Sequence, residues 1–233
     1  MFAAIRRHLA ASAPHDAVRA AHDAAAAHGV DVSARDEQSA TVSFEGTAVE
    51  RFCQALEAVA GHCLVVGGEA AAADALRQII VERGARRIAV SDSPLARRVT
   101  GMAKALAANT GGESELIEDA SASVLFDCDL GVTGAQWGVA ETGTLVLESD
   151  AERHRLASLV PSAHVAMIEA RNVRQTLGEV LRAINERGEE ELSRAITFIT
   201  GPSRTSDIEL TLAIGVHGPA ELYVIVIGGE GND

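Results

Sequence analysis

Residues 62–90 read HCLVVGGEAAAADALRQIIVERGARRIAV, and this segment indicates the class of fold. The apolar run His62–Val66 ends at two glycines and predicts a buried strand. A helix is predicted over Ala70–Arg83, where Gly84 stops it, and a second apolar strand over Arg87–Val90. A strand, a helix and a strand at this spacing favour a right-handed βαβ unit with parallel strands.

The alternation of helices and strands continues on both sides of this segment. Apolar residues at helical spacing predict a helix over Thr47–Ala60, which Gly61 closes, and another over Leu95–Ala108. Further strands are predicted at Ala40–Phe44, Leu130–Thr133, Thr144–Glu148, Ala163–Ile168, Ile196–Thr200 and Ala220–Ile227, and further helices at Pro14–His28, Val173–Arg187, Glu189–Ala195 and Ser206–Ala213. We therefore expect an α/β fold of three layers, in which a mainly parallel sheet carries helices on both faces.

The domain organisation is expected to be simple. One α/β domain is predicted over residues 39–228, preceded by a helical segment, 1–38, and followed by a disordered tail, 229–233. Arginines interrupt the apolar N-terminus, so we expect an amphipathic helix there and not a signal peptide. No stretch approaches the ~20 apolar residues of a spanning helix, and no membrane span is expected.

Composition and charge narrow the class of partner. Apolar residues make up 47% of the chain and aromatic residues only 3%, which favours a core of Val, Leu, Ile and Ala. The formal net charge of −13 disfavours nucleic acid and anionic membrane surfaces, because both bind through clustered Lys and Arg. A small anion is not excluded, because it responds to the local field and not to the total charge.

The cysteines bear on redox chemistry. Cys53, Cys63 and Cys128 are odd in number and form no CxxC motif. We therefore expect no disulfide framework and a reducing, cytoplasmic compartment. Three thiolates cannot build a site that needs four, so no cofactor is expected in this chain, and any iron–sulfur cluster is expected on a partner chain.

The first of three segments that could carry chemistry is GVTGAQWGVAETGT, residues 131–144. Its glycines allow the backbone to approach a ligand closely, and Glu141 could act as a nucleophile, a base or a hydrogen-bond acceptor. The other candidate ligand-binding residues of this segment are Thr133, Gly134, Thr142 and Gly143. The alternative is a tight hairpin whose glycines only turn the chain.

The second segment is TGPSRTSDIE, residues 200–209. Ser206 and Glu209 have capping-box spacing, which predicts a helix start whose amides bind an anion. Arg204 could add a bidentate donor for a carboxylate or phosphate, or could pair structurally with one of the nearby acids. The candidate ligand-binding residues here are Gly201, Ser203, Arg204, Thr205, Ser206, Asp207 and Glu209.

The third segment is GVHGP, residues 215–219. His217 lies between glycines, where it is accessible and could act as an acid or a base. A single histidine without a second spaced ligand is a weak metal signal, so no metal site is expected. We expect Glu141, Arg204 and His217 to share one cleft, because parallel sheets bind ligands beyond the carboxyl ends of their strands.

Three longer stretches resemble the LUD (lactate-utilisation) domain family, over about residues 60–228. They are GVTGAQWGVAETGTLVLES (131–149), RLASLVPSAHVAMIE (155–169) and FITGPSRTSDIELTLAIGVHGPAELYVIVI (198–227). The resemblance implies a fold of the NagB/RpiA/CoA-transferase type and action beside two iron–sulfur partners in the oxidation of L-lactate to pyruvate. CoA transferases of this fold class place a catalytic glutamate in a loop similar to 140–143, which suggests acyl-transfer chemistry at Glu141.

The main hypothesis is therefore an accessory subunit of an iron–sulfur L-lactate oxidation system that binds a small organic anion. Two alternatives stay open. One is a stand-alone enzyme that acts on a phosphorylated or CoA-linked metabolite through Glu141. The other is a non-catalytic scaffold for the iron–sulfur subunits.

Overall fold

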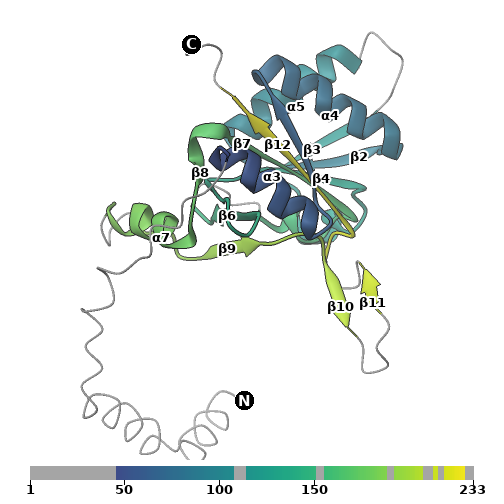
Figure 1. Cartoon of the computed structure of the whole chain (residues 1–233). Helices are drawn as coiled ribbons and strands as arrows, with labels where there is room; N and C mark the ends of the chain where they lie inside the picture. The colour runs from purple at the N-terminus through teal and green to yellow at the C-terminus, as the bar shows by residue number, and fades with distance from the viewer. Residues whose placement is uncertain are drawn as a thin grey trace, which may run out of the picture. The chain divides into compact units, whose positions relative to one another are not determined.

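The computed structural model describes residues 46–107, 114–150, 155–187, 192–206, 212–214 and 218–228 (Figure 1). The predicted helix Pro14–His28, the predicted strand Ala40–Phe44 and the predicted tail 229–233 lie outside the described residues. No described helix is long and apolar enough to cross a membrane.

The main sheet has six strands in the order β1-β12-β7-β4-β2-β3, and every neighbouring pair is parallel. The strands are β1 (His62–Val66), β2 (Arg87–Val90), β3 (Glu115–Glu118), β4 (Leu130–Gly134), β7 (Ala163–Glu169) and β12 (Glu221–Ile227). Of these, β3 alone was not predicted from the sequence. The α/β fold with a mainly parallel sheet is confirmed.

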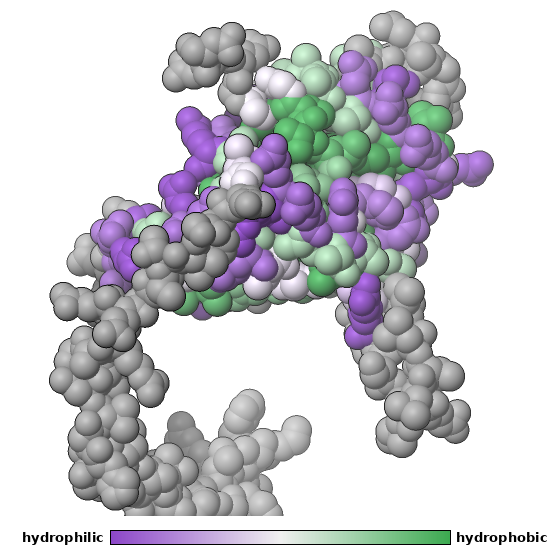
Figure 2. Space-filling view, viewed as in Figure 1, coloured by the Kyte–Doolittle hydropathy of each residue, from purple (hydrophilic) through white to green (hydrophobic). Residues whose placement is uncertain are grey.

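Strand β1 departs from its prediction because it lies at the edge of the sheet, where β12 is its neighbour. Val65 is 59% exposed, so the expectation of a fully buried strand is wrong. An apolar run suits a half-covered edge strand as well as a central one, and only the strand order separates the two. Figure 2 shows hydrophobic side chains gathered on this side of the molecule, toward helices α4 (Glu69–Arg83) and α5 (Pro94–Ala107).

Helices α4 and α5 cover one face of the parallel sheet and lie side by side (Figure 1). Each follows the carboxyl end of a strand, as the βαβ pattern predicts. Their buried apolar side chains pack against those strand residues that point to this face, and the resulting core includes Leu76, Ile79, Val99, Ile88, Val132, Val165, Met167 and Ile225.

The other face is covered by α3 (Ala48–Ala58) and by a second sheet, which the sequence did not predict. This sheet has the order β8-β5-β6-β9, with β5 (Trp137–Val139), β6 (Thr144–Glu148), β8 (Val173–Arg174) and β9 (Ile196–Ile199). Its core with the parallel sheet includes Phe52, Leu56, Leu145, Leu147, Ala166, Ile168, Val224 and Val226. Strands β6 and β9 were predicted, but their antiparallel pairing depends on contacts between distant segments.

Three predicted helices are corrected. Helix α7 spans Leu177–Asn185, because Val173–Arg174 pairs as strand β8 instead of starting the helix. The predicted helix Glu189–Ala195 is wrong over its described part, 192–195, which is not helical. The predicted helix Ser206–Ala213 is also wrong over its described residues, because Ser206 and Leu212–Ala213 lie in strands.

Strands β10 (Arg204–Ser206) and β11 (Leu212–Ile214) replace that last helix and pair in antiparallel register. The capping-box spacing of Ser206 and Glu209 suggested a helix, but apolar residues at 210, 212 and 214 alternate with the period of a strand. The alternation of apolar residues, which predicts a strand, therefore agrees with the structure, and the capping-box spacing does not.

Cys53 and Cys63 form a disulfide, contrary to the expectation from the cysteine count. Helix α3 packs against β1 and brings the two Cα atoms to 5.3 Å, a separation typical of disulfides. Cys128 is free and buried. The count and the absence of CxxC could not reveal this pairing, because it depends on the packing of a helix against a strand.

Two glycines bring separate loops against the backbone of α3. Gly143, in the β5–β6 turn, has φ +64°, and a Cβ there would lie 2.3 Å from the backbone nitrogen of Leu56. Gly201, after β9, has φ +84°, and a Cβ there would lie 2.9 Å from the carbonyl oxygen of Val59. Both positions require glycine for the packing of this layer.

Gly143→Ala is expected to lower the free energy of unfolding by at least about 2 kcal/mol, because the new methyl group would displace α3 and strain the backbone. Gly101→Ala, in α5 with open space around it, is the matched control and should stabilise by at most about 1 kcal/mol. Urea denaturation followed by circular dichroism measures both. Equal effects of the two substitutions would contradict the packing constraint at Gly143.

Candidate ligand site at the carboxyl edge of the parallel sheet

A crevice opens between β2 and β4, because the chain leaves these neighbouring strands toward opposite faces of the sheet. After β2 it enters α5 on one face, and after β4 it enters β5 on the other. Ligands of open α/β sheets bind at such a reversal, beyond the carboxyl ends of the strands. A cavity of about 370 Å³ lies here, and its lining includes Ser93, Pro94 and Arg98 on one side and Gly134, Gln136 and Trp137 on the other.

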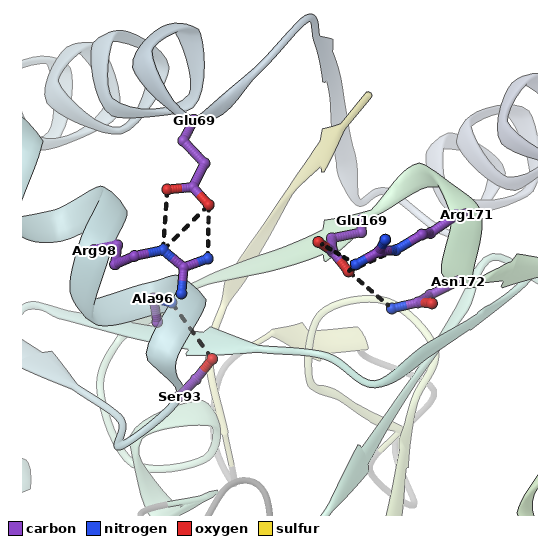
Figure 3. A network of polar contacts seen from close by, with 7 residues as sticks. All are labelled: Glu69, Ser93, Ala96, Arg98, Glu169, Arg171 and Asn172. Carbon is purple, nitrogen blue, oxygen red and sulfur yellow. Dashed lines mark hydrogen bonds and ion pairs between the residues drawn. The ribbon is translucent and has the colours of Figure 1, made fainter. Parts of the chain in front are cut away.

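Arg98 of α5 forms a bidentate ion pair with Glu69 of α4 at this cavity (Figure 3). Nε and Nη2 of Arg98 donate to the Glu69 carboxylate, and the shortest contact is 2.6 Å. These hydrogen bonds lower the pKa of Glu69 and raise the pKa of Arg98. Nη1 of Arg98 has no partner among the described residues, so one edge of the guanidinium is available to an acceptor in the cavity.

Glu169, at the carboxyl end of β7, lines the same cavity together with Asn172. Its carboxylate accepts hydrogen bonds from Nη2 of Arg171 at 2.8 Å and from Nδ2 of Asn172 at 3.5 Å (Figure 3). The negative charge of Glu169 also contributes to raising the pKa of Arg98. The two ion pairs therefore lie within electrostatic reach of each other.

A second cavity, of about 590 Å³, lies next to the first along the carboxyl edge and shares Glu169 with it. Gly68, Glu69, Met102, Arg171 and Gly228 contribute to its lining. The two cavities together lie along the carboxyl ends of β1, β12, β7, β4 and β2, and both have acidic and basic side chains in their lining.

Glu148 forms the inner wall of the first cavity and is only 2% exposed. Its carboxylate accepts hydrogen bonds from Nη2 of Arg187 at 2.6 Å, from Nε1 of Trp137 at 3.0 Å and from the Ser193 hydroxyl at 3.4 Å. Its backbone N–H donates to Oε1 of Gln136 at 2.7 Å. This buried charge is therefore held in a fixed position by several partners.

Of the residues predicted from the first segment, Gly134 lines the crevice and Thr133 lies just below it inside the sheet. The hydroxyl of Thr133 forms a hydrogen bond of 2.8 Å with Nε2 of His164. Both of these side chains are buried. The part of Thr133 and Gly134 in ligand binding stays a prediction.

Glu141 and Arg204 take partners at the ends of two different helices. Oε1 of Glu141 accepts the backbone N–H of Leu177 at 2.7 Å, at the start of α7. Nη2 of Arg204 donates to the carbonyl oxygen of Val59 at 2.7 Å, at the end of α3. Neither side chain is among the described residues that line the crevice, so their part in ligand binding stays a prediction.

Three threonine hydroxyls join the first and second segments. Thr142 contacts Thr144, and Thr144 contacts Thr200, with Oγ1–Oγ1 distances of 2.7 Å in both cases. The structure therefore does bring residues 142–144 and 200–201 together, on the surface of α3. Gly201 and Ser203 line a separate cavity at the opposite, amino edge of the sheet.

The structure does not describe the side chains of the remaining candidates. His217, Asp207 and Glu209 lie outside the described residues, and only the backbone of Thr205 and Ser206 is described. Within the described part of the chain, no group of three or more His, Cys, Asp or Glu side chains could hold a metal ion.

Sequence reasoning did not single out Arg98, Glu148, Glu169 or Arg187, although the structure brings them to the crevice. One signal was present. Glu169 directly follows the strand predicted over Ala163–Ile168, and Ser93 comes shortly after another predicted strand, which is where ligand contacts in parallel sheets arise. Arg98 lies inside a helix and Arg187 in the turn after one, and neither position carries such a signal.

A parallel sheet with a polar crevice where the connections reverse defines an α/β domain of the ligand-binding type. Residues 49–227 match the model of the LUD domain, and the chain belongs to this family.

Curated relatives agree with this assignment. Lactate utilization protein C of Deinococcus radiodurans is 40% identical over 101 residues, which cover 43% of this chain and 47% of that protein. The protein of the same name from Halalkalibacterium halodurans is 36% identical over 121 residues, 51% of this chain and 50% of its own, so the chain spans about half the length of both. The one from Exiguobacterium sp. is 31% identical over 170 residues, 71% of this chain and 72% of that protein.

A crystal structure of a DUF162 family protein from Deinococcus radiodurans has a similar fold. It superimposes with a TM-score of 0.57 at 24% sequence identity, and the match covers 78% of this chain and 96% of that one. At this identity the likeness supports the fold alone.

Arg187→Ala is expected to lower the free energy of unfolding by about 2–3 kcal/mol, because it leaves the Glu148 carboxylate buried without its cation. The cost stays below that of a fully buried pair because Arg187 is 35% exposed. Adding Glu148→Gln should recover part of the loss, since a neutral amide can still accept from Trp137. Chemical denaturation measures both variants.

Arg182→Ala, on the exposed face of α7 just before Arg187, serves as the control and should change stability by less than about 0.5 kcal/mol. A double variant less stable than Arg187→Ala alone would show that the uncompensated charge is not the cause.

Proposed function

We propose that this chain takes part in lactate utilisation as an accessory subunit of an iron–sulfur L-lactate oxidation system, and that its crevice binds a small 2-hydroxy acid such as lactate. One observation carries the proposal. Nη1 of Arg98 has no partner among the described residues, whereas the other charged side chains of the cavity are paired. The names of the relatives, lactate utilization protein C, support the same role.

The crevice can recognise both groups of a 2-hydroxy acid. A guanidinium edge binds a carboxylate through charge-assisted hydrogen bonds. The first turn of α5, which starts at Pro94, borders the same cavity and favours a negative charge through its amides and its dipole. The hydroxyl group could then donate to Glu169 or accept from Asn172, which lie on the β7 side of the cavity.

The local charges explain how an acidic protein could hold an anion. The formal net charge is −13, but Glu69, Glu148 and Glu169 are each engaged by an arginine. Each ion pair reduces the repulsion that its carboxylate would exert on an incoming anion. We therefore expect the affinity for the anion to depend on Arg98.

The oxidation itself requires an acceptor for two electrons as well as the release of two protons. We assign the electron acceptor to the iron–sulfur partner subunits. The role proposed for this chain is to bind and orient the substrate, or to hold the partners in place. The polar groups that line the crevice serve the first of these roles.

Isothermal titration of the purified chain with L-lactate tests the site. Arg98→Ala should raise the Kd for L-lactate at least about tenfold, because it removes a charge-assisted hydrogen bond. Arg77→Ala, which removes an ion-paired arginine from α4 away from the crevice, should leave the Kd unchanged. Failure of the unmodified chain to bind lactate or pyruvate, or an unchanged Kd in Arg98→Ala, contradicts the proposal.

The variants Glu141→Gln and Arg98→Ala separate the alternative functions. Turnover of a phosphorylated or CoA-linked metabolite by the isolated chain, lost in Glu141→Gln, would support a stand-alone enzyme. Lactate oxidation by the reassembled subunits that is insensitive to Arg98→Ala would support a scaffold. The hydrogen bond from the Leu177 amide gives Glu141 a structural role, which is why we favour the crevice.

A further inference from the structure

The amino edge of the parallel sheet holds a separate cavity of about 210 Å³. It is formed by the end of the 3-10 helix η2 (Arg155–Ser158), the start of β7, strand β9 and the loops that follow β9 and precede β12. The crevice described above lies beyond the opposite ends of these strands. The two sites therefore have no described lining residue in common.

The described lining of this cavity has no charged side chain. Its apolar part comprises Leu159, Phe198, Ile199, Pro202, Pro219 and Leu222, and its hydroxyl groups belong to Ser158, Thr197, Thr200 and Ser203. No Arg, Lys, Asp or Glu is among the described lining residues. A charged ligand would lose its hydration here without gaining a partner of opposite charge, so the cavity suits an uncharged ligand.

His164 is the remaining polar side chain of the described lining, and it is 1% exposed. Its Nε2 forms the hydrogen bond with Thr133, but its Nδ1 is buried and has no hydrogen-bond partner among the residues that the structure describes. Such orphaned side-chain nitrogens are rare in folded proteins and call for a specific explanation. Burial lowers the pKa of His164 to about 3, so the ring is neutral near pH 7.

We propose that the amino-edge cavity is a second ligand site, which takes a small uncharged molecule with a hydroxyl, carbonyl or amide group, and that Nδ1 of His164 is its hydrogen-bond partner. A neutral imidazole offers one donor and one acceptor, and the rotatable Thr133 hydroxyl can match either tautomer. Nδ1 can therefore donate to a carbonyl or accept from a hydroxyl. A water molecule fills about 30 Å³ of liquid, so the cavity has room for a larger occupant.

Lactamide is the probe of choice because it matches lactate in size and lacks its charge. Histidine ring ¹⁵N–¹H correlation spectra of the unmodified chain should show a saturable shift of the His164 Nδ1 signal with lactamide and with hydroxyacetone. The His164 signals are identified by their loss in His164→Gln. Lactate at equal concentration should shift them far less.

His164→Gln should raise the Kd for lactamide about tenfold, because the ligand loses its partner at Nδ1. His62→Gln, which changes a histidine outside this cavity, is the matched control and should leave the Kd unchanged. If His164→Gln does not fold, Gly218→Ala replaces it, since its methyl group would lie 3.2 Å from Cβ of Ser203 at the cavity wall and should weaken lactamide binding.

Arg98→Ala separates this proposal from the function proposed for the crevice. It should weaken lactate binding and leave lactamide at His164 unchanged. The second site is overturned if neither uncharged probe moves the His164 signals, or if lactamide binds His164→Gln as tightly as the unmodified chain. If the Nδ1 signal is typical of a hydrogen-bonded nitrogen and no probe changes it, the partner is a resident water. That result also overturns the second site.

Discussion

The structure depends on covering both faces of a parallel sheet. Six parallel strands present apolar side chains alternately to two faces, and neither face can remain in water. Helices α4 and α5 cover one face, whereas α3 and a second, four-stranded sheet cover the other. Because β2 leads to the first layer and β4 to the second, the chain must diverge between them. The crevice at the carboxyl edge is the consequence of this divergence.

The second layer is anchored by close backbone contact. Gly143 and Gly201 allow two loops to touch α3, and the hydroxyl chain from Thr142 through Thr144 to Thr200 joins those loops to each other. The β5–β6 hairpin that these contacts hold also carries Trp137 and Glu148 to the crevice. Packing at one end of the hairpin therefore positions polar groups at its other end.

The two edges of the parallel sheet differ in their electrostatics. At the carboxyl edge, arginines and glutamates pair around a cavity, and the pairing leaves part of one guanidinium without a partner among the described residues. At the amino edge, the described lining has no charged side chain and contains one neutral, buried imidazole. Thr133, next to Gly134 of the crevice, contacts this imidazole, so a single strand, β4, connects the two regions. A molecule with a net charge of −13 can in this way offer environments suited to quite different ligands.

The sequence alone determined the class of fold and most of its elements. Short-range patterns, such as the apolar run of β1, the helical spacing of α3 and the glycine after α4, depend only on neighbouring residues, which is why they were predictable. They also placed Gly134 at the carboxyl edge, because that position follows from the end of a predicted strand. The family resemblance came from the same local motifs.

Tertiary structure decided the rest. The edge position of β1, the pairing of β6 with β9 and the disulfide between Cys53 and Cys63 each join residues whose proximity no local pattern encodes. The hairpin at β10 and β11 overrode a helix-capping signal, because strand alternation and antiparallel pairing prevailed over the first turn of a helix. Arg98 reaches the crevice through the packing of its helix and Arg187 from the turn after α7, whereas Glu141 accepts a hydrogen bond at the start of α7. The partners of a side chain depend on which layers pack around it, and local sequence patterns do not indicate which layers will pack together.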